Sequence, residues 1–197
     1  MKSRKAFTLI ELLVVIAIIA VISVVVILSL NPAELLRQSR DSGRLSDLST
    51  IKSAILLYLA DAQSPNIAAS AFGYGSCYVS SISGGSGTTT AKCGVFTGAY
   101  ATNVSSSAAN YRKIDSTGWV PVNFSSLSYG SPFGALPVDP VNNNTTTYYA
   151  YAATSTGGSF FELDAFMESA KYTVTMANDG GNNANVYEIG NQPGLNL

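Results

Sequence analysis

The chain has 197 residues, of which 47% are hydrophobic and 12% are charged, and its formal net charge is −1. It contains no histidine, which removes the commonest general base, the usual hydrolase triads and most zinc sites. No basic stripe of the kind that follows a phosphate backbone is visible, so we predict neither enzymatic activity nor direct nucleic-acid binding.

The amino-terminal part of the chain contains a long apolar segment. Residues 7–30 carry a single charge, Glu11, and as a helix they would be about 36 Å long, enough to cross a bilayer. The basic residues before the segment would hold that end in the cytoplasm. A cleaved secretory signal would be shorter and would have its small-residue cut site after the apolar run. An ordinary membrane anchor would not need a carboxylate, although one near the helix end can snorkel or be protonated.

The stretch KAFTLIELLVVIAIIAVI resembles the class III signal of type IV prepilins and type II secretion pseudopilins. The resemblance implies that a prepilin peptidase removes residues 1–6 by cutting between Ala6 and Phe7, and that Phe7 is then N-methylated. Ala6 stands where the family usually has glycine. Glu11 matches the family's glutamate, which is thought to pair with the terminal amine of a neighbouring subunit. Because an unpaired buried charge is unfavourable, such pairing would favour one axial register during assembly.

A second helix is expected directly after the apolar segment. Asn31 can cap a helix, Pro32 suits its first position, and Glu34 stands where a capping box requires an acid. Because the proline ring clashes with the carbonyl group four residues before it, we expect a kink or a melted turn over residues 28–31. The filament-core helix would thus cover residues 7–30, followed by an amphipathic helix over residues 31–62.

This amphipathic helix has an apolar stripe that would pack on a sheet. The stripe residues follow helical spacing of three or four: Leu45, Leu48, Ile51, Ile55 and Leu59. The charged residues fall mostly off the stripe: Asp41, Arg44, Asp47 and Lys52. We therefore expect these charges on the exposed side of the helix.

Residues 63–197 would form the globular head, of which residues 63–145 are rich in Ser, Gly, Ala and Thr and read as a loop region. Cys77 and Cys93 lie within it, and an even cysteine pair in an exported chain indicates a disulfide. Two buried free thiols are the alternative. The cluster of Trp119 with its apolar neighbours looks like a small buried core element.

Residues 146–190 read as antiparallel strands: TYYAYAA, SFFELDAFM, KYTVTMA and NVYEI. In the second strand Phe161 and Leu163 alternate with Glu162 and Asp164, a pattern typical of a half-buried strand. A sheet of about four antiparallel strands over the long helix gives an α+β class, which agrees with the pilin fold. The stretch ALPVDPVNNNTTTYYAY also resembles the LP-x-DP…Y-x-Y region of major pseudopilins.

The segment NDGGNNANVYE gathers oxygen ligands on a glycine-rich loop and could bind calcium through Asp179, Asn183, Asn185 and Glu188. Major pseudopilins carry a calcium loop in a similar place. Several positions that are Asp there are Asn here, which lowers the charge of the ligand set. The alternative is a hydrogen-bonded turn without metal, and no other cofactor is expected.

The resemblance implies a structural subunit, a major pilin that polymerises with identical subunits into a type IV pilus for attachment, motility or DNA uptake. Its partners would be the prepilin peptidase and the inner-membrane assembly platform. The precursor would lie in the cytoplasmic membrane and the assembled filament on the cell surface. A pseudopilin of a type II secretion-like system and a minor pilin acting as an adhesive module are the alternatives.

Overall fold

The computed structural model describes residues 7–68, 74–81, 92–93, 95–96, 102–143, 146–154, 159–192 and 194–197. The leader, including Ala6, lies outside the described residues. Residues up to Arg37 and residues from Gln38 onward form two compact units, each of which is described by itself. We call residues 38–197 the head.

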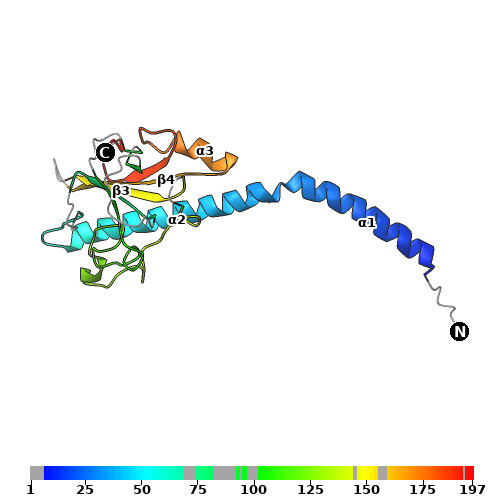
Figure 1. Cartoon of the computed structure of the whole chain (residues 1–197), viewed down its shortest axis with the longest axis horizontal. Helices are drawn as coiled ribbons and strands as arrows, with labels where there is room; N and C mark the ends of the chain where they lie inside the picture. Colours follow the sequence, from blue (N-terminus) through cyan, green and yellow to red (C-terminus); the bar gives the residue numbers. More distant parts are fainter. Residues whose placement is uncertain are drawn as a thin grey trace. The chain divides into compact units, whose positions relative to one another are not determined.

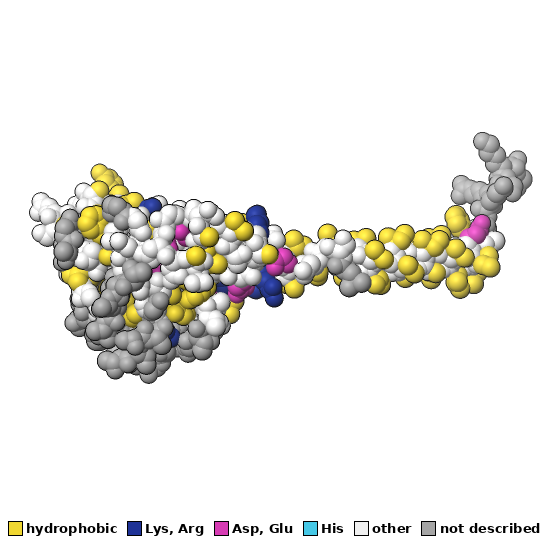
Figure 2. Space-filling model, turned by 90° about the horizontal axis from the view of Figure 1, so that it is seen from above, with side chains coloured by type: hydrophobic (Ala, Val, Ile, Leu, Met, Phe, Trp, Pro, Cys, Tyr) yellow, Lys and Arg dark blue, Asp and Glu magenta, His cyan; other side chains and the backbone are white. Residues whose placement is uncertain are grey.

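The first helix, α1, covers Leu9–Leu30 and begins at the N-cap residue Thr8 (Figure 1). Its 22 residues correspond to about 33 Å of helix. The stretch Leu9–Ile27 has a mean hydropathy of 3.3 and is long and apolar enough to cross a membrane. Figure 2 shows hydrophobic side chains gathered along this helix.

A single residue, Asn31, separates α1 from the second helix, α2, which covers Pro32–Asp61. Asn31 has a left-handed backbone with φ 41°, a conformation that asparagine tolerates better than most residues. Its side-chain Oδ1 and backbone oxygen both accept from the Glu34 backbone N–H, at 3.4 and 3.0 Å. The structure therefore interrupts the apolar helix at the end of the segment where the proline led us to expect a break.

The head contains a five-stranded sheet in the order β2-β1-β3-β4-β5. The strands cover Ser76–Val79, Thr102–Ser105, Tyr149–Thr154, Phe160–Ala165 and Tyr187–Gly190, numbered β1 to β5 along the chain. Four of them, β1, β3, β4 and β5, pair antiparallel, and β2 lies parallel to β1 at the edge. The predicted α+β class, with a long helix and a four-stranded antiparallel sheet, is confirmed.

One face of the sheet packs against α2. The stripe residues Leu48, Ile51 and Ile55 are fully buried and form a single core with side chains of β3 and β4. The sheet residues in this core share one face by strand alternation: Tyr78, Tyr149, Tyr151, Ala153, Phe161, Leu163 and Ala165. Trp119 belongs to the same core, is fully buried, and donates to the Pro137 backbone oxygen at 2.8 Å.

Two features of the head differ from the sequence expectations. The strands β1 and β2 lie within residues 63–145, which we predicted as a loop region. The predicted strand KYTVTMA is instead the helix α3, Ala170–Met176. Ser169 caps this helix by accepting from the Tyr172 backbone N–H, and Val174 is 65% exposed, which does not fit a half-buried strand. The cap and the helical spacing of Tyr172 and Met176 favour a helix, and they outweigh the strand preference of the β-branched residues between them.

The opposite face of the sheet is also covered. A second core joins Ala150 and Ala152 of β3 to residues from distant parts of the chain: Cys77, Val79, Cys93, Val95, Phe96, Tyr148, Val186 and Leu197. The sheet is therefore buried on both sides. This corrects the prediction of a half-buried strand, because Glu162 and Asp164 are each only 1% exposed.

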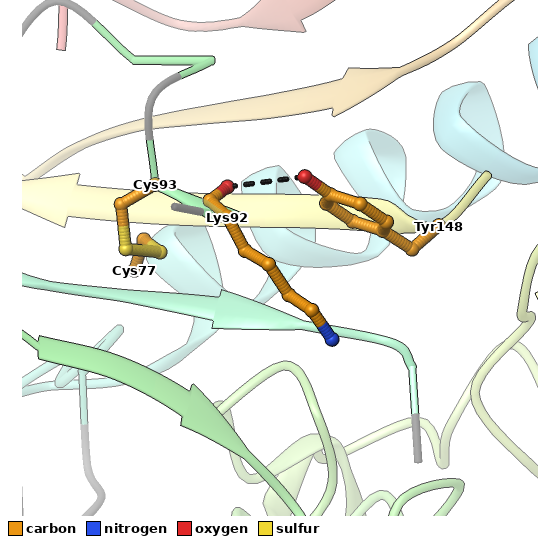
Figure 3. The surroundings of a disulfide bond; sticks show 4 residues. All are labelled: Cys77, Lys92, Cys93 and Tyr148. Carbon is orange, nitrogen blue, oxygen red and sulfur yellow. Dashed lines mark hydrogen bonds between the residues drawn. A yellow bond between two sulfur atoms is a disulfide. The ribbon is translucent and has the colours of Figure 1, made fainter. Parts of the chain in front are cut away.

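Cys77 and Cys93 form a disulfide with a Cα–Cα distance of 5.7 Å (Figure 3). The Tyr148 hydroxyl donates to the Lys92 backbone oxygen at 3.3 Å beside it, and the Lys92 ammonium donates to the Ser81 hydroxyl at 2.7 Å. The disulfide therefore fixes the segment around Cys93 against the sheet.

Removing this disulfide by the double substitution Cys77→Ser and Cys93→Ser is expected to destabilise the head by about 3 kcal/mol, because the open chain gains loop entropy when it unfolds. Thermal unfolding of the detergent-solubilised chain would then shift down by roughly 6–12 °C. A reducing agent should lower the Tm of the wild type in the same way and leave the double variant unchanged. Equal Tm values for oxidised and reduced wild type would contradict this expectation.

Candidate functional site

The amino-terminal end of α1 is organised by Thr8 and Glu11. The Thr8 backbone N–H and hydroxyl both donate to Glu11 Oε2, at 2.9 and 2.8 Å. The Glu11 backbone N–H donates back to the Thr8 hydroxyl oxygen at 3.3 Å. These contacts form a capping box, which satisfies donors that the first turn of a helix leaves without intrahelical partners. A carboxylate here also complements the positive end of the helix dipole.

The surface of α1 is apolar on all sides. The exposed fractions of its large hydrophobic side chains run from 47% for Val15 to 82% for Leu9, and Phe7 just before the helix is 83% exposed. A continuous apolar surface of this length is typical of a helix that lies in lipid or packs against other helices. Glu11 is the one charged residue within this surface.

Residues 1–27 match the family model for the prokaryotic N-terminal methylation motif. The amino-terminal segment is a class III signal peptide of the type IV pilin-like kind. Comparisons with curated proteins and with solved structures gave no match. The matched residues contain the predicted cut site, Phe7 and Glu11.

The motif is typical of precursors that a prepilin peptidase processes and that assemble into pili or pseudopili. It indicates a structural subunit. The apolar helix and the motif together fit a membrane-anchored precursor. The cut between Ala6 and Phe7 and the methylation of Phe7 remain predictions.

A buried group of charges, which we call the ion cluster, lies where α2 enters the head. It consists of Asp41, Arg44, Asp139 and Glu168. The Arg44 guanidinium is fully buried and donates to Asp139 Oδ2 at 2.6 Å, to Asp41 Oδ1 at 2.7 Å and to Glu168 Oε1 at 3.1 Å. Arg40 also forms an ion pair with Glu168. Asp41 and Arg44, which we expected on the exposed side of the helix, are thus fully buried.

The ion cluster fastens α2 to two distant turns of the head. Asp139 Oδ1 accepts from the backbone N–H groups of Val141 and Asn142, at 2.8 and 3.0 Å. Asp41 Oδ2 accepts from the Ser169 backbone N–H at 2.8 Å and from its hydroxyl at 2.6 Å. Asp139 belongs to the stretch that resembles major pseudopilins, so the structure gives that residue a role in holding the long helix.

The ion cluster makes stability depend on pH through Asp41. Burial alone would raise the pKa of Asp41, but hydrogen bonds from Ser169, Glu168 and Arg44 outweigh burial and lower the pKa below its usual value. A depressed carboxyl pKa gives stability that is complete above the unfolded value of about 3.9 and is lost as the pH falls through the folded value.

We therefore expect the free energy of unfolding to fall steeply below about pH 4. Denaturant titrations of the detergent-solubilised chain between about pH 6 and about pH 2 would measure this. Asp41→Asn should lower stability at neutral pH and flatten the acid-induced loss, whereas Glu34→Gln, a half-buried acid of α2 outside the head, should change neither. An unchanged acid profile in Asp41→Asn would contradict the assignment.

The loop of the predicted calcium ligands is held by hydrogen bonds of its own. Asp179 Oδ1 accepts from the Gly181 backbone N–H at 2.9 Å, and its Oδ2 accepts from the Glu188 backbone N–H at 2.8 Å. Asn183 Oδ1 accepts from the Asn185 backbone N–H at 3.1 Å, and its amide donates to the Val95 backbone oxygen at 2.9 Å. The side-chain oxygens of Asp179 and Asn183 therefore accept hydrogen bonds within the turn. Calcium binding by this loop remains a prediction.

Glu188 is the member of that predicted set that points into the protein. With Glu162 and Asp164 it forms what we call the carboxylate cluster, in which one oxygen of each residue lies within 4.8 Å of the others. Asp164 and Glu188 are direct partners across β4 and β5, and Glu162 is two residues from Asp164 on the same strand face. All three are at most 1% exposed.

Burial strongly affects the charge state of the carboxylate cluster. It raises the pKa of Glu162 to about 7, with the charge of Glu188 adding to the effect. Burial and the charges of Glu162 and Glu188 raise the pKa of Asp164 well above its usual value. Two carboxylate charges 4.8 Å apart repel by roughly 3–4 kcal/mol at an effective dielectric of about 20. The cluster therefore requires either protons or a cation.

Proposed function

We propose that this chain is the major subunit of a type IV pilus, a helical homopolymer assembled through α1 and displayed on the cell surface. The observation that supports this proposal is the apolar surface of α1. Its side chains are exposed on all sides, and its one charge, Glu11, is near the amino-terminal end. Lipid covers this surface in the precursor, and the α1 helices of neighbouring subunits cover it in the filament.

Two further features support a repeating subunit. Glu11 is one helical turn from Phe7, so a free amine at Phe7 in a neighbouring copy would find a carboxylate of opposite charge at this level of the bundle. The head is a single α+β unit in which the ion cluster, the two-sided core and the disulfide hold α2 firmly. Such a head can be repeated along a fibre without a further domain.

Electron microscopy of fibres sheared from cells, with mass spectrometry of their main protein, tests the proposal. We expect long fibres made of this chain, starting at N-methylated Phe7. Fibres composed of another protein, or a chain recovered only from the cytoplasmic membrane, would contradict it.

A pseudopilin of a secretion system is the second candidate, because the stretch resembling major pseudopilins contributes Asp139 to the ion cluster. Such a subunit would form a short periplasmic assembly. Deleting it would then block export of a secreted protein while leaving surface fibres unchanged, whereas deleting a major pilin removes the fibres.

A further inference from the structure

The carboxylate cluster has oxygens that the fold leaves without partners. Both side-chain oxygens of Asp164, Glu162 Oε1 and Glu188 Oε1 are buried, and in the described part of the chain no group outside the cluster donates to them. Across the same described residues, no lysine or arginine forms an ion pair with any of the three. Buried ionised carboxylates are normally paired or bound to a metal, so three carboxyl groups at one place require either shared protons or a cation.

The remaining oxygens of the two glutamates are fixed by backbone donors. Glu162 Oε2 accepts from the Leu197 backbone N–H at 3.0 Å, and Glu188 Oε2 accepts from the Asn183 backbone N–H at 2.7 Å. Each glutamate is thus held through Oε2, whereas its Oε1 is buried without a fixed donor. Outer contacts of this kind orient the ligands of metal sites.

The spacing of the oxygens suits calcium. Ligands on opposite sides of calcium are separated by about 4.6–5.2 Å, twice the usual calcium–oxygen distance. The three oxygens of the cluster lie within 4.8 Å of one another. On the neighbouring strand β3, Asp164 is opposite Ala150 and Glu162 is opposite Ala152.

We propose that Glu162, Asp164 and Glu188 bind one hard divalent cation, calcium, on the sheet face opposite α2. Three carboxylates supply negative charge and oxygen ligands, the donor set that calcium prefers. The cation would link β4 to β5, and through the hydrogen bond to Glu188 it would also stabilise the loop that contains Asn183. The site differs from the predicted loop site, because two of its three ligands come from β4.

The test compares the thermal unfolding of the full chain in detergent with a chelator, with calcium and with magnesium. Calcium at about a hundred times its Kd is expected to raise the Tm by roughly 5–10 °C, because it binds only the folded state. Magnesium at the same concentration should give a smaller rise, since it demands a tighter octahedron. An equal rise with magnesium would overturn the assignment to calcium, and no rise with either ion would overturn the site.

Variants separate the carboxylate cluster from the loop. Asp164→Asn and Glu162→Gln change residues that belong to the cluster alone, keep the side-chain shape and remove one charge each, so both should abolish the calcium-induced rise. Asn185→Ala changes a predicted loop ligand outside the cluster and should retain the full rise. The opposite pattern, with the rise lost in Asn185→Ala and kept in Asp164→Asn, would overturn the proposal in favour of the loop.

A direct measurement keeps the test decisive if a variant fails to fold. Calorimetric titration of the chelator-treated wild type should show one calcium per chain, and absence of binding would overturn the proposal. In the chelator, Asp164→Asn should be at least as stable as the wild type, because it removes repulsion within the cluster. The inference concerns the head alone, so its outcome is independent of whether the chain forms a pilus.

Discussion

Glu11→Gln is expected to abolish surface filaments while the chain still accumulates in the membrane with a folded head. Glutamine can replace glutamate in a capping box, so the contacts with Thr8 and the start of α1 are retained. The substitution removes only the charge that would meet the amine of a neighbouring subunit. Yield of sheared fibres per cell, with immunoblotting of the membrane fraction, measures the effect.

Thr8→Val is the matched control for Glu11→Gln. It removes the hydroxyl that contacts Glu11 and keeps the carboxylate, so it weakens the capping box without changing the charge. If charge pairing governs assembly, Thr8→Val cells make fibres and Glu11→Gln cells do not. Fibres in Glu11→Gln cells and none in Thr8→Val cells would show instead that the helix cap is the important feature.

Arg44→Met is expected to destabilise the head by about 3–5 kcal/mol, the largest effect of any single substitution that we propose. Methionine fills much of the volume but leaves Asp41 and Asp139 buried without their cation. The midpoint for thermal unfolding should fall by roughly 6–20 °C. Denaturation of the detergent-solubilised chain, followed by circular dichroism, measures both quantities.

Two variants test whether the lost charge is the cause. Arg37→Ala removes an exposed arginine from the same helix, whose contact with Glu34 spans 3.8 Å, and should cost less than about 1 kcal/mol. Arg44→Met combined with Asp139→Asn removes one of the two carboxylate charges left without a cation, and it should recover part of the lost stability. A double variant as unstable as the sum of both single changes would show that the residues contribute independently.

The amino-terminal half of the long helix was predictable because its signal is continuous in the sequence. The apolar run, its lone acid and the Asn31-Pro32 break are local features, and each follows from neighbours within a few residues. The stripe of α2 was predictable for the same reason. Its buried residues Leu48, Ile51 and Ile55 repeat with helical spacing.

The ion cluster was missed although part of its signal was present. Asp41 and Arg44 continue the same three-and-four spacing as Leu48 and Ile51, so they belong to the buried side of α2. We expected them in solvent because charged residues are seldom buried without partners. Two of the three partners of Arg44, Asp139 and Glu168, are 95 and 124 residues away, and no local pattern identifies them.

The carboxylate cluster was missed for a related reason. Alternation in β4 correctly separates Phe161 and Leu163 from Glu162 and Asp164, but alternation cannot say whether the second face is open or covered. The cover comes from residues around Cys93 and from Leu197, which have no periodicity that links them to the strand. Packing between residues this far apart in the sequence can be seen only in the structure.

The position of the ion cluster has a mechanical consequence. Tension that reaches the head through α2 meets Asp41 and Arg44 first among the residues fully buried in the core. Arg44 holds the turn that contains Asp139, and Asp41 holds the one that contains Ser169, so the bonds to both turns oppose the extraction of α2. A subunit under tension would therefore resist the extraction of its helix more strongly than a subunit whose helix is held by apolar contacts alone over an equal area.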